Sequence, residues 1–264
     1  MRVLIRKTYR DVSRTAAFMV AALMESRPDV VLGLATGSTP LGLYEELIVL
    51  HREGRLDFSR ITTFNLDEYM GLSAGHPQSY RFFMDNNLFD HININREQTH
   101  VPDGSLPTDQ LETACIEYEK AIRRAGGIDL QVLGIGGNGH IAFNEPGASL
   151  ASRTRLVALD EQTIKDNARF YDSENEVPRF ALSMGIGTIL EAREIILLAT
   201  GHKKAPVVAE AIEGPMTSRL PASALQIHGK VTFILDEEAA SLLKDSSRYR
   251  FLEKTEEMIG MKLY

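Results

Sequence analysis

The chain has a single cysteine and no long apolar run, and both absences exclude classes of protein. Cys115 alone can form neither an internal disulfide nor a thiolate cage for a metal ion, so a reducing cytoplasm is the simplest location for the chain. The longest apolar run, Ala16–Met24, is too short to cross a bilayer, so no membrane partner is expected. The first residues also lack the basic, apolar and small succession of a signal peptide.

Basic residues are also in the minority. The chain has 29 Lys and Arg residues and 36 Asp and Glu residues, which gives a formal net charge of −7. A nucleic-acid partner is therefore not expected, because affinity for a phosphate backbone needs a concentrated basic surface. A small phosphate ligand is still compatible with this charge, because salt screens distant exposed charges beyond about 10 Å.

Short aliphatic runs alternate with longer helical patterns, with no repeat or linker between them. The runs are continuously apolar, which is typical of strands buried on both faces. We therefore predict an α/β fold, a Rossmann-like open and mainly parallel sheet with helices on both faces, in a single domain of residues 1–264. The predicted strands are Val30–Ala35, Arg60–Phe64, Asp129–Gly134, Glu194–Ala199 and Lys230–Leu235. The predicted helices are one capped by Asp11, then Leu41–Arg52, Thr108–Ala125, Lys203–Ile212 and Glu237–Lys244.

Ligands of such sheets bind beyond the carboxyl ends of the strands, so the segments that follow the predicted strands are the candidate sites. The first segment, Thr36, Gly37, Ser38 and Thr39, offers backbone N–H groups at a helix start, which is an anion-binding arrangement. A plain capped turn is an equal alternative here. The second segment contains the adjacent acids Asp67 and Glu68. They point in different directions, so one can serve as a general base while the other binds backbone or surface. A solvated loop is the alternative.

The third segment, Gly134–Pro146, carries three glycines in the dinucleotide pattern G-x-G-x-x-G. That pattern requires a helix after the last glycine, and Pro146 argues against one, so a nicotinamide oxidoreductase is a weak alternative. His140 and Glu145 are five residues apart, about 140° on a helix, so they meet only if the chain folds back as a loop. Glu145 would then orient the imidazole for proton transfer. A buried, satisfied histidine is the alternative.

A fourth segment, Thr200–Lys204, places cations at a helix start. Cations there oppose the helix dipole, which suggests that an anionic ligand compensates them, although solvated surface lysines are common. Arg153, Arg155 and Arg169 follow the glycine segment, where we expect a mobile lid, roughly residues 153–180, to bring a phosphate clamp.

Taken together, these residues resemble the glucosamine-6-phosphate deaminase family over nearly the whole chain. The segments that carry the resemblance are Leu34–Pro40, Thr63–Tyr69, Gly134–Pro146, Ser149–Arg155 and Lys203–Ala205. The resemblance implies conversion of glucosamine 6-phosphate and water to fructose 6-phosphate and ammonia in amino-sugar catabolism, without a metal or other cofactor. By position, Asp67 matches the base that moves a proton from C2 to C1, His140 the group that opens the sugar ring, and Glu145 its carboxylate partner. Asn138 stands where some members have Asp, and we expect it to orient the pair by hydrogen bonding. The residues matching the substrate and phosphate site are Thr36, Gly37, Ser38, Thr39, Gly136, Arg169 and Lys204.

Two other functions are rivals. A 6-phosphogluconolactonase-like hydrolase would need no base for C2, so Asp67 argues against it, and release of ammonia would decide. A non-catalytic sugar-phosphate sensor would lack the complete set of base and relay residues. The oligomeric state is left open, a homo-oligomer included. Family members activated by N-acetylglucosamine 6-phosphate carry Lys where this chain has Val157, so no such activation is expected.

Overall fold

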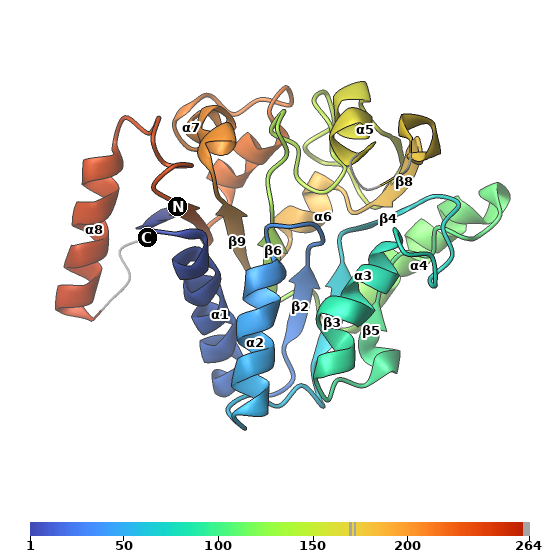
Figure 1. Cartoon of the computed structure of the whole chain (residues 1–264), viewed down its shortest axis with the longest axis horizontal. Helices are drawn as coiled ribbons and strands as arrows, with labels where there is room; N and C mark the ends of the chain where they lie inside the picture. Colours follow the sequence, from blue (N-terminus) through green and yellow to red (C-terminus); the bar gives the residue numbers. More distant parts are fainter. Residues whose placement is uncertain (169–170, 172, 261–264) are drawn as a thin grey trace.

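A computed structural model describes residues 1–168, 171 and 173–260, and it has the predicted α/β architecture (Figure 1). Seven strands form one fully parallel sheet in the order β1-β10-β9-β6-β2-β3-β5. The strands are β1 (Arg2–Arg6), β2 (Val31–Leu34), β3 (Thr62–Asn65), β5 (Thr99–His100), β6 (Leu130–Leu133), β9 (Glu194–Ala199) and β10 (Val231–Asp236). All five predicted strands are present, and their long apolar runs are buried as expected.

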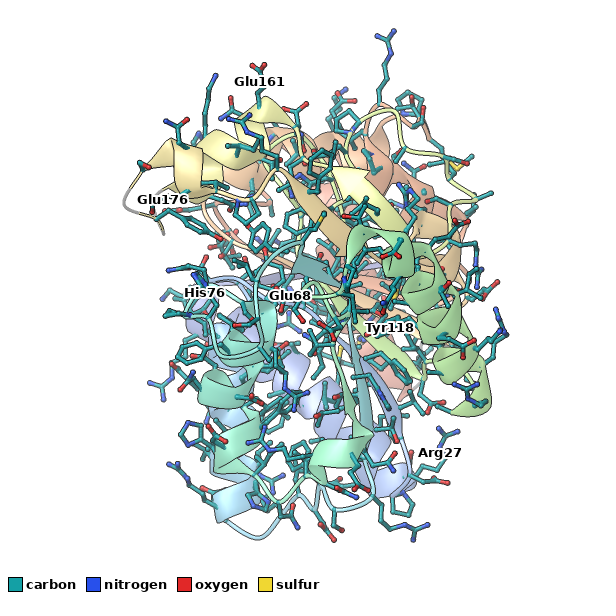
Figure 2. The ribbon with its side chains drawn as sticks, turned by 90° about the vertical axis from the view of Figure 1, so that its right-hand side faces the viewer. Arg27, Glu68, His76, Tyr118, Glu161 and Glu176 are labelled. Carbon is teal, nitrogen blue, oxygen red and sulfur yellow. The ribbon has the colours of Figure 1, made fainter. Side chains whose placement is uncertain are left out.

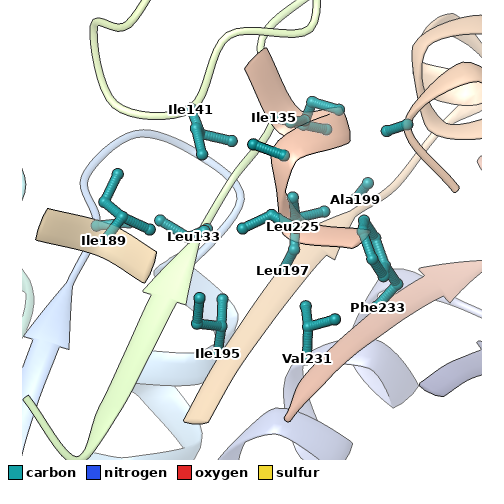
Figure 3. Close-up of a cluster of buried hydrophobic side chains, with 14 of the residues drawn as sticks. Leu133, Ile135, Ile141, Ile189, Ile195, Leu197, Ala199, Leu225, Val231 and Phe233 are labelled. Carbon is teal, nitrogen blue, oxygen red and sulfur yellow. The ribbon is translucent and has the colours of Figure 1, made fainter. Parts of the chain in front are cut away.

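Helices cover both faces of this sheet, and each face has its own apolar core. One face carries α1 (Tyr9–Ser26), α2 (Leu41–Arg52) and α3 (Tyr80–Asn87). The other face carries α4 (Leu111–Arg124), α6 (Ile186–Leu190) and α7 (Ala205–Glu213). Figure 3 shows part of this second core, with side chains of β6, β9 and β10 packed together. The last helix, α8 (Ser246–Ile259), packs against β1. No helix in the described ranges is both long and apolar enough to cross a membrane.

Two local predictions are wrong. Thr8, not Asp11, caps α1, since its hydroxyl accepts the N–H of Asp11 within the first turn. The segment Glu237–Lys244 forms turns instead of a helix. The carboxylate of Asp236 accepts the N–H of Ala239, as a helix cap does, and the N–H of Ala240 donates to the carbonyl of Asp236. At the far end, however, the N–H of Lys244 donates to Glu213 instead of to the carbonyl of Ala240, as a helix would require.

A second, antiparallel sheet of three short strands was not anticipated. It consists of β4 (Asp67–Tyr69), β8 (Phe180–Ser183) and β7 (Arg155–Ala158), joined in that order. This sheet and helix α5 (Glu161–Asn167) lie on the side toward which the strands of the large sheet point (Figure 1). Part of the predicted lid, residues 153–180, is therefore ordered structure above the carboxyl ends of the strands.

The order of the strands reverses between β2 and β6. From β2 the chain adds β3 and β5 on one side, and β6 then returns to the other side of β2. Loops diverge at such a reversal and leave a crevice beyond the carboxyl ends, where open α/β sheets bind their ligands. The strands that precede all four candidate segments, β9, β6, β2 and β3, are neighbours here.

Candidate active site

The glycine segment leaves β6 as a tight loop stacked on the imidazole of His140. The N–H of Gly136 donates to the carbonyl of His140 at 2.9 Å, and Gly139 has a φ of +87° that a side chain would strain. A Cβ atom on Gly136 would lie only 2.2 Å from the imidazole ring. Ile135 and Ile141, on either side of the loop, enter the core beneath it (Figure 3). The backbone of the loop therefore packs against the imidazole of His140, and Ile135 and Ile141 anchor the two ends of the loop in the core.

The chain then folds back, as predicted, and brings Glu145 to His140. The turn uses an isolated bridge between Ile141 and Asn144. The Nδ1 atom of His140 lies 2.8 Å from Oδ1 of Asn138 and 3.3 Å from Oε2 of Glu145. Nδ2 of Asn138 donates to the same Oε2 at 2.8 Å. The three side chains therefore form one cluster, with Asn138 between the other two.

This cluster determines which imidazole nitrogen is basic. Oδ1 of Asn138 also accepts the backbone N–H of His140, and an amide oxygen can only accept hydrogen bonds. Nδ1 of His140 is therefore the protonated nitrogen, which leaves Nε2 of the neutral ring as the proton acceptor. Burial by itself raises the pKa of Glu145, but hydrogen bonds from His140, Thr163 and Asn138, with the charge of His140, lower it to about 2. Glu145 is thus a carboxylate at any ordinary pH.

Asp67 and Glu68 begin strand β4 and have separate tasks. Glu68 accepts hydrogen bonds from the hydroxyl of Ser79 and from the backbone N–H groups of Tyr80 and Arg81, so it caps α3. Figure 2 shows Glu68 in the interior of the molecule. The carboxylate of Asp67 makes no hydrogen bond within the described part of the chain, although only 6% of Asp67 is exposed. Burial, with the neighbouring charge of Glu68, raises the pKa of Asp67 to about 8. The expected division between one free acid and one backbone-bound acid is confirmed.

The segment Thr36–Thr39 connects β2 to the start of α2, at the reversal of strand order. Gly37 has a φ of +95°, and no side chain caps the first turn of α2. The hydroxyl of Tyr9 replaces a cap, because it accepts the N–H of Gly42 at 2.7 Å and donates to the carbonyl of Ser38 at 3.2 Å. Sequence reasoning missed Tyr9, which lies far from this loop along the chain.

The start of α7 differs from the expectation in one respect. Carboxylates of the chain itself lie beside this segment, where Asp236 accepts the N–H of Gly201 and Glu238 accepts the N–H of His202. Lys203 is exposed. Lys204 instead turns toward the glycine loop, where its Nζ donates to the carbonyl of Ile135 at 2.7 Å. One of the two lysines is therefore at the candidate site.

The arginines expected in a phosphate clamp have different positions. The guanidinium of Arg153 is held by Glu119 and Glu191, so it is not available as a clamp, which corrects that expectation. Arg155 donates to Oδ1 of Asn144 at 3.0 Å. Arg169 lies outside the described residues.

Across residues 1–168, 171 and 173–260, no group of three or more His, Cys, Asp or Glu side chains is placed to hold a metal ion. The chemistry that the described side chains can perform is proton transfer, by His140 with Glu145 on one strand end and by Asp67 on another.

The sequence of the chain matches a known protein family and individual members of it. Residues 6–233 match the family of glucosamine-6-phosphate isomerases and 6-phosphogluconolactonase. The chain is 54% identical over 243 residues to glucosamine-6-phosphate deaminase of Halothermothrix orenii, covering 92% of this chain and 100% of that protein. It is 51% identical to the enzyme of that name from Cellvibrio japonicus, with 96% of each chain covered.

Solved structures agree with these sequence matches. A monomeric glucosamine-6-phosphate deaminase superimposes with a TM-score of 0.89 at 48% identity, over 92% of this chain and all of the other. The 6-phosphogluconolactonase of Trypanosoma cruzi gives a TM-score of 0.74 at 21% identity, over 92% of this chain and 97% of that one, which shows a shared fold.

Proposed function

Because the chain belongs to the glucosamine-6-phosphate isomerase and 6-phosphogluconolactonase family, we propose that it converts α-D-glucosamine 6-phosphate and water to D-fructose 6-phosphate and ammonia, in the breakdown of amino sugars. The observation that supports this function over lactone hydrolysis is the buried carboxylate of Asp67, which has no hydrogen-bond partner among the described residues. Lactone hydrolysis has no use for a base beside C2, whereas isomerisation of an amino sugar requires one.

The phosphate group binds, in this proposal, at the reversal of strand order. Backbone N–H groups of Thr36, Gly37, Ser38 and Thr39 surround it at the start of α2, where the helix dipole favours an anion. Lys204 adds a positive charge from the segment that follows β9 at the same edge of the sheet, and its bond to the carbonyl of Ile135 directs it there. Arg169 and the backbone of Gly136 complete the set proposed from the sequence. Phosphate binding contributes remote energy that aligns the reacting carbons.

Ring opening is assigned to Nε2 of His140, the nitrogen that is basic in the neutral ring. It removes the proton of the anomeric hydroxyl and returns a proton to the ring oxygen as the C1–O5 bond breaks. Asn138 and Glu145 keep Nδ1 protonated, and Glu145 stabilises the imidazolium that forms in between. These side chains thus act as one unit.

Isomerisation is assigned to Asp67. Its carboxylate removes the proton from C2 of the open-chain aldehyde while O1 takes a proton from the substrate's ammonium group, which gives an enolamine. The carboxyl group then delivers its proton to C1, which leaves an iminium at C2. Water adds to that iminium, and ammonia leaves as the ketone forms. A base with a pKa raised to about 8 holds the C2 proton well between the two steps, because its protonated form is favoured inside a dry site.

The proposal treats residues 1–264 as a single catalytic domain with residues 153–180 as its lid. It requires no cofactor and has no nucleic-acid or membrane partner. A cytoplasmic location is proposed, in keeping with the lone cysteine. A homo-oligomer stays an open alternative, and the similar solved deaminase is described as monomeric.

A coupled assay tests the function directly. Purified protein treated with a chelator is mixed with glucosamine 6-phosphate, and ammonia and fructose 6-phosphate are both measured. Equal amounts of the two products support the proposal. Hydrolysis of 6-phosphogluconolactone without any ammonia from the amino sugar would instead support the lactonase alternative.

A further inference from the structure

The two oxygens of Glu145 bind different parts of the molecule. Oε2 faces the imidazole of His140 and the amide of Asn138. Oε1 accepts a hydrogen bond from the hydroxyl of Thr163 at 2.6 Å, from a residue 18 positions further along the chain. Thr163 is buried within α5, in the segment expected to be a lid. A helix outside the large sheet therefore holds one half of the carboxylate that orients the imidazole.

Helix α5 packs outside the two large cores. Ile164 lies in a small apolar cluster with Tyr69 and Phe143, which is separate from those cores. The amide of Asn167 donates to the hydroxyl of Tyr69 at 2.9 Å. The opposite side of the helix faces solvent, where Glu161 points away from the molecule (Figure 2). An element that packs on a small separate cluster can separate at lower free energy than the large cores can unfold.

The Thr163 contact also removes a degree of freedom from Glu145. The terminal torsion of a Glu side chain is broad, so hydrogen bonds determine its orientation. With Oε1 bonded to Thr163, Oε2 is directed at Nδ1 of His140. Among the described residues, His140 is the titratable group that contacts Glu145, and Asn138 and Thr163 are its polar partners. Without the hydroxyl of Thr163, the carboxylate can rotate away from the imidazole.

We propose that Thr163 is a positioning residue through which the docking of α5 holds Glu145 against His140, so that the proton relay is complete only while α5 is seated. This inference rests on the proposed deaminase function. It predicts that the hydroxyl of Thr163 acts on the rate of the chemical step and on which ring nitrogen of His140 carries the proton, rather than on substrate binding.

The test compares Thr163→Val, which keeps the shape and removes the hydroxyl, with Thr163→Ser, which restores it. The matched control is Glu161→Gln. Glu161 lies on the solvent side of α5, so this change leaves the cap of the helix, its docked side and the Thr163 hydroxyl in place. For each protein, kcat and KM are measured against pH with glucosamine 6-phosphate. Nitrogen-15 NMR of His140 without substrate reports which ring nitrogen carries the proton.

For Thr163→Val we expect kcat to fall about 10- to 100-fold with little change in KM, as for a displaced catalytic group. In the NMR spectrum, Nδ1 of His140 should carry its proton for less of the time, because the carboxylate that faces it can rotate away. Thr163→Ser should recover most of the rate. Glu161→Gln should leave both kcat and the proton on Nδ1 unchanged.

Three outcomes overturn the inference: an unchanged kcat in Thr163→Val, failure of Thr163→Ser to recover the rate, or the same fall in kcat in Glu161→Gln as in Thr163→Val. Should Thr163→Val not fold, Thr163→Ala removes the same hydroxyl. Should the wild type release no ammonia, the proposed function fails. The NMR comparison then still decides whether Thr163 keeps the proton on Nδ1.

Discussion

Asp67 and Glu68 are adjacent in the chain, and their carboxylates lie in opposite hydrogen-bonding environments. Glu68 accepts bonds from Ser79 and from three backbone N–H groups, including its neighbour Tyr69. Asp67 is equally buried and accepts none within the described residues. Burial raises the pKa of both acids, but only in Glu68 do hydrogen bonds oppose that effect. The acid without bonds is the one whose protonation can change during a reaction.

The first prediction concerns how the turnover rate depends on pH. Asp67 must be deprotonated to accept the C2 proton, and its pKa is raised to about 8. Activity should therefore rise with pH through neutrality toward that value. Asp67→Asn should slow turnover by roughly 100-fold or more, the usual effect of a positioned base, while substrate still binds. Exchange of the C2 proton with deuterium from solvent is the measurement, and near-normal exchange in the variant would remove Asp67 from this role.

The same group should affect stability. The folded pKa of Asp67, about 8, lies above its ordinary value of 3.8, so its favourable contribution is complete below that ordinary value and is lost as pH rises through about 8. Asp67→Asn removes this dependence. Relative to wild type, the variant should gain free energy of unfolding between about pH 4 and pH 9, with a full pKa unit worth about 1.4 kcal/mol. Urea unfolding at both pH values measures the gain, and a constant difference contradicts the raised pKa.

A third prediction concerns His140 and Glu145. Since Nδ1 of His140 lies 3.3 Å from Oε2 of Glu145 and both serve one relay, removing either should disable it. The double variant His140→Gln, Glu145→Gln should be little slower than His140→Gln alone. Both defects should shrink with open-chain substrate, or when the reaction runs from fructose 6-phosphate. Additive losses would show two independent roles.

Tyr9→Phe should weaken phosphosugar binding. The variant removes the hydroxyl that joins the carbonyl of Ser38 to the N–H of Gly42 and so loosens the loop before α2. Loss of a neutral hydrogen bond of about 1 kcal/mol predicts a KM increase of roughly 5-fold with kcat nearly unchanged. Inhibition by inorganic phosphate should weaken in parallel. A fall in kcat at constant KM would instead connect Tyr9 to the chemistry.

Lys204→Ala should also act on binding. The charge-assisted contact proposed between Nζ and the phosphate corresponds to roughly 1.5–3 kcal/mol, so the dissociation constant should rise about 10- to 150-fold. Arg169→Ala is expected to behave in the same way. Calorimetric titration with the phosphosugar and with free glucosamine measures the preference. A variant that still prefers the phosphosugar as strongly as wild type would exclude its residue from the phosphate site.

Local sequence predicted five of the seven strands of the large sheet and the meeting of His140 with Glu145, but it missed β1 and β5. Continuously apolar strands such as Glu194–Ala199 can be stable only when both faces are covered, which already implies a parallel sheet between helices. The meeting of His140 with Glu145 depends on the chain between them and on the proline that follows Glu145, so its geometry is also local. The separate tasks of Asp67 and Glu68 follow from the alternation of side chains along a strand.

Only the tertiary structure decided which distant groups complete the site. Thr163, Tyr9 and the acid pair Asp236 and Glu238 act through hydrogen bonds to residues far away in the chain, and such bonds leave no periodic trace in the sequence. The short strands β4, β7 and β8 gave no signal either, because their stability comes from pairing with one another rather than from an apolar run. The segment 237–244 forms turns where a helix was predicted, and at its end the distant carboxylate of Glu213 accepts the N–H of Lys244. Periodicity reports burial by neighbouring elements, whereas single hydrogen bonds across the fold exist only once those elements have packed.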